Sequence, residues 1–293
     1  MFRKSSRIIP VEIKPEMRIK VLDDEKLEKI HQATLTVLKE AGVRFPSEKA
    51  LKIFADAGAE VDFKSQIVKI PPDLLMDAIA KAPRTYTMAS RRDPDLDLHL
   101  DGTKTYLGTD DTGTATIDLE TRKRRASTKK DVAMMALISD YLPSVSFYCP
   151  MVSAQDVPSE VILLYELEAS FINTEKHVLI MSCVEEKIAR YALEIATLIA
   201  GDSRRIRKRS PLFLFVATFA PLGQDKGALE AALTFAKAGI PVGFEASPSM
   251  GSTAPVSIAG AMAVGNAEIL SALYPGAPVF YAFMPEMIKS TDR

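Results

Sequence analysis

The residues of this chain best suited to chemistry follow one short apolar run near its C-terminal end. Glu245 closes that run, and the next segment, Ser247 to Pro255, is rich in hydroxyl and turn residues. The carboxylate of Glu245 can oppose a positive charge, the hydroxyls of Ser247 and Thr253 can donate hydrogen bonds, and Gly251 lets a ligand approach the backbone closely. We therefore take Glu245 and this loop as a candidate site.

The elements around Glu245 are predicted to be strand, loop, helix and strand. Pro241 to Ala246 is too short for a globular helix and is bounded by turn residues, so it indicates a buried strand. Pro255 opens a helix that extends to Leu273, and Val279 to Phe283 is the next strand. Sites of α/β proteins lie where this loop lies, at the carboxyl ends of strands.

Composition limits the class of protein. The chain has 293 residues, 47% of them hydrophobic and 26% charged, which is typical of a globular protein. A net charge of −1 gives no reason to expect nucleic acid, and no window approaches the roughly 18 apolar residues of a membrane span. No apolar signal core follows the basic start, so we expect a cytoplasmic protein. Cys149 and Cys183 lack any CxxC spacing and are predicted to be buried, inert thiols, with no metal site.

From Thr105 onward, strand-like runs alternate with helical stretches. The predicted strands are 105–108, 145–151, 178–183, 212–219, 242–245 and 279–283, and the predicted helices are near 129–141, 158–172, 185–200, 226–238 and 255–273. This order fits both an eight-fold βα barrel and an open doubly wound sheet. Neither GxGxxG nor GxxxxGK occurs, so the barrel is favoured.

The first part of the chain has a different, mixed pattern. Helices capped by Asp23 or Asp24 and by Ser47, a hairpin over Glu60 to Ile70 and a third helix after Pro71 indicate a small α+β domain. We therefore divide the chain into an N-terminal α+β domain, 1–104, and a TIM-type βα barrel domain, 105–293. Six predicted strands against the usual eight make that barrel incomplete.

A specific pattern surrounds the candidate loop. Pro248, Gly251, Thr253, Pro255 and Ala259-Gly260 are followed by Asn266-Ala-Glu268 and Pro275-Gly-Ala-Pro278. Through these residues the chain resembles the trimethylamine methyltransferase superfamily, and Tyr106 to Thr109, Asp118 to Arg125 and Asp156-Val157-Pro158 agree in the same order. The helix between Asn266 and Pro275 is shorter than is usual in the family, and the family's last third is absent, so we expect a C-terminally truncated member.

The resemblance implies a function. Members are βα barrels that move a methyl group from an amine to the cobalt of a separate corrinoid protein. The chain would then bind no cofactor directly, would act on a small methylated amine, and would have a corrinoid protein that carries cobalamin as its partner. Members acting on trimethylamine are known for a pyrrolysine in the later part of the barrel, whereas others use quaternary amines such as glycine betaine.

The chemistry of such a substrate suggests which side chains hold it. Displacing a methyl group from a quaternary ammonium leaves a neutral amine, so no general base is needed, and the protein must position a cation between aromatic rings and a carboxylate. We predict Glu245 and Tyr281 as the catalytic residues. The predicted substrate-binding residues are Asp110, Tyr148, Phe219 and Phe244, with Ser247, Gly251 and Thr253 of the loop. Because alternate strand residues point toward the helices, about half of the aromatic residues should belong to the core.

Two further interpretations concern partners and alternatives. The basic run Arg122 to Arg125, with Lys129-Lys130, follows the first barrel strand and could help to seat a corrinoid protein, whereas Arg204 to Arg209 lies toward the opposite face. Unpaired strand edges at 105–108 and 279–283 are compatible with a homo-oligomer. The alternative functions are a catalytically inactive family fragment and an unrelated barrel lyase. A lyase would require a strand-end Lys or a cluster of metal ligands, and no predicted strand ends in Lys.

Overall fold

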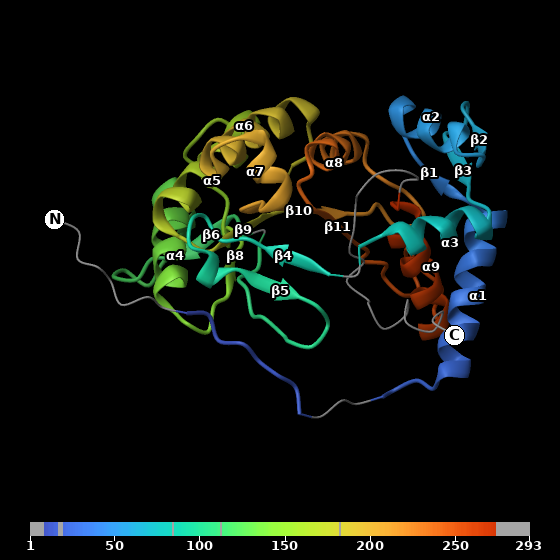
Figure 1. The fold of residues 1–293 in the computed structure, drawn as a ribbon, viewed down its shortest axis with the longest axis horizontal. Helices are drawn as coiled ribbons and strands as arrows, with labels where there is room; N and C mark the ends of the chain where they lie inside the picture. Colours follow the sequence, from blue (N-terminus) through green and yellow to red (C-terminus); the bar gives the residue numbers. More distant parts are fainter. Residues whose placement is uncertain (1–8, 17–19, 84, 112, 182, 274–293) are drawn as a thin grey trace.

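The computed structural model describes residues 9–16, 20–83, 85–111, 113–181 and 183–273. A four-stranded parallel sheet lies in the middle of the molecule (Figure 1). Helices α4 to α8 flank it on one side, and α1, α2 and α9 lie at the other end of the view. The chain is therefore a mixed α/β protein built around a parallel sheet.

The first elements form the mixed region that the sequence predicts. They are α1 (Asp24–Glu40), β1 (Val43–Arg44), α2 (Glu48–Asp56), β2 (Glu60–Asp62), β3 (Ile67–Lys69), α3 (Pro72–Lys81), β4 (Tyr86–Met88), a 3-10 turn η1 (Pro94–Leu96) and β5 (Leu98–Leu100). The Asp23 carboxylate accepts a hydrogen bond from the Lys26 N–H at 2.9 Å and so caps α1, as expected. The hairpin β2–β3 pairs with β1 in one antiparallel sheet.

Four parallel strands follow in chain order. They are β8 (Phe147–Tyr148), β9 (His177–Ile180), β10 (Leu212–Ala217) and β11 (Val242–Glu245). Beyond β8 the sheet continues through isolated parallel bridges, between Gly108 and Phe147 and between Gly113 and Val152. Neighbours in the sheet are thus neighbours in the chain, which is the order of a barrel wall; a doubly wound sheet reverses its order at one point.

Helices connect these strands. They are α4 (Lys129–Tyr141), a 3-10 turn η2 (Ser159–Val161), α5 (Ile162–Asn173), α6 (Glu186–Ala200), α7 (Ser203–Lys208), α8 (Lys226–Ala238) and α9 (Ile258–Ser271). The hairpin β6 (Ala115–Ile117) and β7 (Arg124–Ala126) precedes α4. Helices α5 and α8 contact the strands directly, and α9 packs along α1 (Figure 1).

The two faces of the sheet bury different side chains. One face points toward the helices and contributes Val178, Leu214, Val216 and Phe244. These side chains belong to one hydrophobic cluster that also includes residues of α1, α2, α5 and α8. On the opposite face Phe213 and Phe215 stack at 6.0 Å between ring centroids, and Tyr86 of β4 packs on Phe213 at 5.8 Å. One hydrophobic core therefore joins the N-terminal elements to the sheet. The division into two domains between residues 104 and 105 stays a prediction.

Most of the predicted repeat is confirmed, with three corrections. The predicted helices at 129–141 and 226–238 and the strand 242–245 match the observed bounds. The predicted strand 105–108 is reduced to two isolated bridges, an antiparallel one between Thr105 and Ile13 and a parallel one between Gly108 and Phe147 of β8. Helix α7, capped by Asp202, and the hairpin β6–β7 were missed because all three elements are short and because α7 and β7 are rich in arginine. The predicted strand 279–283 lies outside the described residues, and closure of the wall into a barrel stays a prediction.

Gly243 leaves the space in which the two phenylalanine rings stack. A Cβ at this position would lie 2.8 Å from Phe213 and 2.9 Å from Phe215, whose side chains are both buried. We predict that Gly243→Ala destabilises the fold by about 1–3 kcal/mol through overpacking, measured by urea unfolding. Adding Phe213→Leu should restore part of that loss, and an unchanged unfolding midpoint in the single variant would contradict this packing.

Candidate functional site

Carboxylates from distant parts of the sequence meet at the carboxyl edge of the sheet. Glu245 ends β11, while Asp110 and Asp111 follow the bridge at Gly108. Burial, and then the charges of Asp110 and Asp111, raise the pKa of Glu245 above its ordinary value. The parallel strands therefore bring like charges together, as the sequence predicts for a site at strand ends.

The carboxylate of Glu245 has no cation to balance it in the part of the chain that the structure describes. It is half-buried, and the groups that shift its pKa are burial and two acidic residues, with no Lys or Arg among them. The same acidic residues act on Cys149, which follows β8. Burial, and then the negative charges of Asp111 and Asp110, raise the pKa of its thiol. A positively charged ligand would relieve this repulsion, which is the property expected of a cation site.

Two of the four predicted aromatic residues lie in the core. Tyr148 is fully buried, and its hydroxyl donates a hydrogen bond to the Val132 carbonyl of α4 at 3.0 Å. Phe244 is 3% exposed and belongs to the cluster beneath the helices. Both occupy the strand positions that alternate with the open face, so their assignment to substrate binding is corrected to a packing role. Tyr281 lies outside the described residues.

Phe219 is placed differently. It follows β10, its side chain is 71% exposed, and the preceding residue, Thr218, donates its N–H to the Glu245 carbonyl at 2.9 Å. Ala217, the last residue of β10, is the register partner of Glu245 and lies on the same face. Continuing the alternation for two residues past the strand predicts that Phe219 lies on this side as well. Phe219 is thus the aromatic candidate available to a ligand at this edge.

The loop residues mainly fold the loop. The hydroxyl of Thr253 accepts a hydrogen bond from the Ser249 N–H at 2.8 Å, and the Ser249 carbonyl accepts from the N–H groups of Thr253 and Ala254. Gly251 has a φ of +79°, a conformation that favours glycine over other residues. Thr253 and Gly251 therefore have structural roles in this turn, while Ser247 remains exposed beside the edge.

Sequence reasoning missed two residues near this edge. Phe215 is the register partner of Gly243, and so it lies on the same face as Glu245. Applying the two-residue period backward from Glu245 through the parallel register would have found it. Glu268 is fully buried in the otherwise apolar helix α9. A carboxylate inside such a helix is the signal that could have found Glu268.

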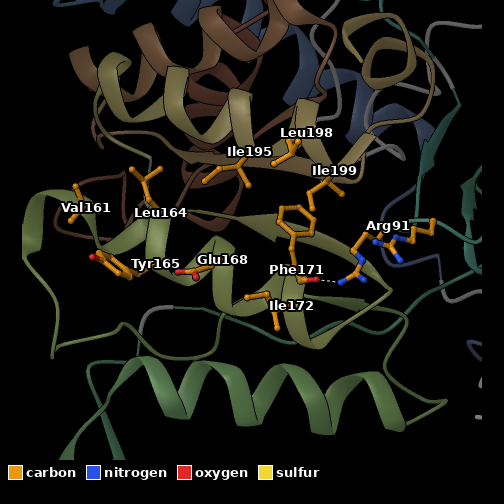
Figure 2. A pocket seen from close by; sticks show the side chains of 11 residues that line it. Arg91, Val161, Leu164, Tyr165, Glu168, Phe171, Ile172, Ile195, Leu198 and Ile199 are labelled. Atoms are coloured by element: carbon orange, nitrogen blue, oxygen red, sulfur yellow. Dashed lines mark hydrogen bonds between the residues drawn. The ribbon is translucent and has the colours of Figure 1, made fainter. Parts of the chain in front are cut away.

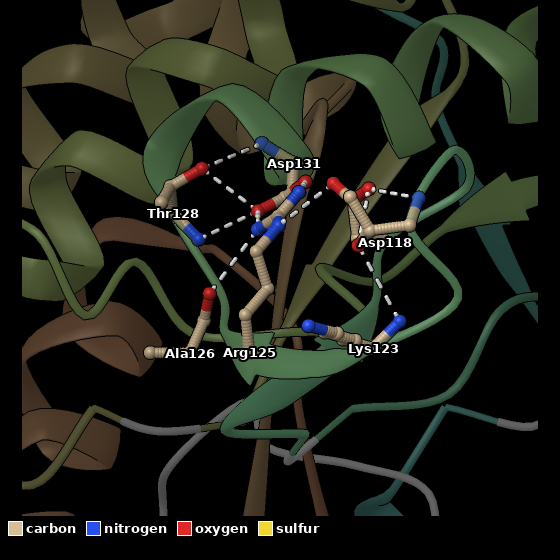
Figure 3. Close-up of polar contacts among 7 residues, drawn as sticks. Asp118, Lys123, Arg125, Ala126, Thr128 and Asp131 are labelled. Carbon is tan, nitrogen blue, oxygen red and sulfur yellow. Dashed lines mark hydrogen bonds and ion pairs between the residues drawn. The ribbon is translucent and has the colours of Figure 1, made fainter.

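The basic run Arg122 to Arg125, with Lys129-Lys130, was predicted to help seat a partner, but ion pairs within the chain neutralise part of its charge. Arg125 donates to both oxygens of Asp131 at 2.7 and 2.8 Å and to Asp118 at 3.2 Å (Figure 3). Lys129 pairs with Glu168 at 2.6 Å. The Arg125 contacts fasten the hairpin β6–β7 to the start of α4, and the Lys129 pair joins α4 to α5. The neighbouring positions 122–124 are exposed, and docking through them stays a prediction.

A cavity of about 870 Å³ lies between α5 and α6, and neither Glu245 nor Asp110 is among its lining residues (Figure 2). Its walls are mostly apolar, with Leu164, Phe171 and Ile195 among them, and two arginines, Arg91 and Arg92, line it as well. The carboxylate of Glu168 and the ring of Tyr165 also line the cavity, but Lys129 already pairs with Glu168 at 2.6 Å and lies over the Tyr165 ring. A small ammonium ion would therefore meet two guanidinium groups and an acidic group whose charge is already balanced. This cavity therefore suits a cation less well than the carboxyl edge does.

Other groups capable of chemistry are buried and engaged. Lys176, at the opposite edge of the sheet, donates to the carbonyls of Ser139 and Leu142 at 2.6 and 2.7 Å, where α4 ends. Cys149 and Cys183 are buried free thiols, as expected. Within the described residues no three His, Cys, Asp or Glu side chains are grouped as a metal ion would need, and no helix is long and apolar enough to cross a membrane.

Comparison with known proteins points to one family. The family model described as trimethylamine methyltransferase (MTTB) matches residues 3–289. The trimethylamine methyltransferase MttB of Desulfitobacterium hafniense is 34% identical over 264 residues, which are 88% of this chain and 53% of that protein. A glycine betaine methyltransferase from another strain of the species is 28% identical, covering 89% of this chain and 55% of that protein. The chain spans about half the length of these curated relatives.

A solved structure was also found. The crystal structure of a hydroxylamine MtmB complex covers 94% of this chain and 63% of that chain, with a TM-score of 0.47 and 17% identity. A likeness of this size does not establish a closed barrel.

The repulsion at the carboxyl edge has a measurable effect on stability. Because the folded protein raises the pKa of Glu245, its ionised form opposes folding at neutral pH. We predict that Glu245→Gln raises the melting temperature at pH 7. The gain should shrink as the pH falls through the raised pKa toward the ordinary glutamate pKa, since the wild-type carboxyl then becomes protonated in the folded state.

The matched control is Glu120→Gln, a change of the same chemistry at an exposed turn residue, and it should leave the melting temperature nearly unchanged. A lower melting temperature for Glu245→Gln at pH 7 would show that the carboxylate stabilises the fold, contrary to this account.

Proposed function

The chain belongs to the trimethylamine methyltransferase family, and we propose that it acts in the transfer of a methyl group from a methylated amine to the cobalt of a corrinoid protein. The observation that best supports this proposal is the uncompensated carboxylate of Glu245 beside Asp110 and Asp111. A methylated ammonium group would supply the missing positive charge. Family membership also argues against the alternative of an unrelated lyase.

The proposed chemistry needs a positioned cation more than it needs a base. When the bond between nitrogen and the methyl carbon breaks, the electron pair stays on nitrogen and a neutral amine leaves. This holds for a quaternary amine and for protonated trimethylamine alike. The task of this chain is then to hold the ammonium so that one methyl group faces the acceptor. Glu245 is proposed to oppose the charge, and Asp110 strengthens the field.

The open face offers one aromatic surface to the same cation. Phe219 is exposed next to the end of β10, and a ring contact with an ammonium is worth about 0.5–2 kcal/mol. Ser247 can donate a hydrogen bond to a polar group of the substrate. We propose trimethylamine or a quaternary amine such as glycine betaine as the substrate class, because relatives of both kinds match the chain.

The corrinoid would be supplied by a partner protein, where its reduced cobalt accepts the methyl group. The basic positions 122–124 are exposed and, like Asp110, follow the bridge at Gly108 in the chain. We propose that they contact the partner around the site. Arg125 is excluded from this role because Asp131 and Asp118 already occupy its guanidinium.

Binding of a small cation tests the site itself. By isothermal calorimetry the chain should bind tetramethylammonium and glycine betaine, and it should bind choline more tightly than 3,3-dimethylbutan-1-ol, the uncharged isostere of choline. Glu245→Gln should weaken binding of the cation by about 10- to 100-fold, the range expected when a charged partner is lost. Binding should also weaken as the pH falls through the raised pKa of Glu245, since the protonated carboxyl no longer opposes the cation.

Methyl transfer tests the activity. The chain would be mixed with a corrinoid protein reduced to cobalt(I), and the cobalt spectrum would be followed with trimethylamine, glycine betaine and tetramethylammonium. We expect a spectral change with at least one amine that Glu245→Gln slows and Glu120→Gln does not. Equal affinity for the cation and its uncharged isostere, or no transfer from any amine, would refute the proposal.

A further inference from the structure

The loop that carries Phe219 is held in place by contacts from beneath the sheet edge. This loop, residues 218–223, joins β10 to α8, and its two ends are bridged by an antiparallel pair in which the Phe219 N–H donates to the Gly223 carbonyl at 2.9 Å. Leu222 adopts a φ of +52°, which is uncommon for a residue other than glycine. A segment with such a backbone needs outside contacts to fix its shape.

The buried carboxylate of Glu268 supplies those contacts. One oxygen accepts the hydroxyl of Thr218 at 2.7 Å, and the other accepts the N–H of Leu222 at 2.9 Å. Glu268 is fully buried in α9, so these bonds are shielded from water. A single side chain thus fastens both ends of the loop, on the side of β10 opposite Phe219.

Further bonds fix the carboxylate and the loop to the rest of the fold. Gln224 donates to the main-chain carbonyl of Glu268 at 3.0 Å, and the Leu222 carbonyl accepts the N–H of Arg44 at 2.9 Å. Helix α9 is separately tied to α1, because Asn266 donates to the hydroxyl of Thr34 at 3.1 Å, a bond that involves no residue of the loop. The position of Phe219 therefore depends on the contacts made at Glu268.

We propose that Glu268 is a positioning residue for cation binding: it holds the loop so that the Phe219 ring stands beside the Glu245 carboxylate. Glu268 contacts no ligand in this account and acts through Phe219. A buried carboxylate that accepts two directed bonds gives the loop one geometry, which apolar packing alone would specify less strictly. The inference rests on the proposed function for its cation, but the position of the ring can be measured without any ligand.

The first test measures the ring directly. The chain contains no Trp, so Phe219→Trp introduces a single indole fluorophore at the loop. In this background Glu268→Gln should lower the fluorescence anisotropy of the indole and raise its acrylamide quenching constant by about 1.5- to 2-fold. Thr218→Val, which removes one of the two bonds and keeps the carboxylate, should have the same effect to a smaller extent. It replaces Glu268→Gln if that variant does not fold.

Asn266→Ala is the matched control. It removes a buried polar group from the same helix and breaks the tie to Thr34, but it does not touch the loop. It should lower the melting temperature and leave the indole anisotropy and quenching unchanged. Equal changes in these two signals for Asn266→Ala and Glu268→Gln would mean that any loosening of α9 is enough, and the positioning role would be refuted.

The second test asks whether Glu268 acts through Phe219. Glu268→Gln should weaken tetramethylammonium binding about 3- to 10-fold when Phe219 is present, and less than 2-fold in a Phe219→Ala background. Equal losses in both backgrounds would indicate a merely structural role and overturn the inference. If the wild-type chain binds no cation, the proposed function fails, while the fluorescence measurements on the Phe219→Trp background still decide whether Glu268 positions the loop.

Discussion

Parallel strands end at one edge of their sheet. This constraint brings acidic residues that are far apart in sequence close enough to repel one another. Glu245 and Asp110 lie at opposite ends of the strand order, yet the second raises the pKa of the first. The repulsion opposes folding, so it has to be offset elsewhere, by the packing of Phe213 and Phe215 over Gly243 and by the helices on the other face. Sites that bind charged ligands commonly carry such a cost, because groups arranged for a ligand are poorly matched to one another in its absence.

The residues through which the chain resembles its family serve the architecture more than ligand contact. Thr253 and Gly251 shape the turn, Pro248 packs against Gly265 of α9, and Asn266 ties α9 to α1. Glu268, the acidic residue of the same pattern, holds the loop after β10. The pattern therefore specifies how one helix and two loops meet at the carboxyl edge. The groups proposed to face a cation, Glu245 and Phe219, lie outside the spaced motif itself.

Much of the fold could be predicted from sequence because it depends on local signals. Caps and turn residues such as Asp23 fix where helices begin and end, and apolar runs such as Leu212 to Ala217 mark buried strands. The candidate site was predicted less completely. The place of Glu245 at the carboxyl edge could be predicted because it ends an apolar run, but the side on which Tyr148 and Phe244 point depends on register, which a single sequence does not give. Helix α7 and the hairpin β6–β7 were missed because their polar residues carry no apolar period.

The central claim is that the carboxyl edge holds an ionised Glu245 ready for a cation, and the pKa of that carboxyl group tests it most directly. Carbon-13 labelling of glutamate side chains, with Glu245→Gln to assign the signal, allows NMR titration of Glu245 in the chain alone and with tetramethylammonium. The account predicts a pKa above the ordinary value of 4.5 in the free protein, and a lower one with the cation bound, since a bound positive charge favours the carboxylate. An ordinary pKa that tetramethylammonium leaves unchanged would contradict it.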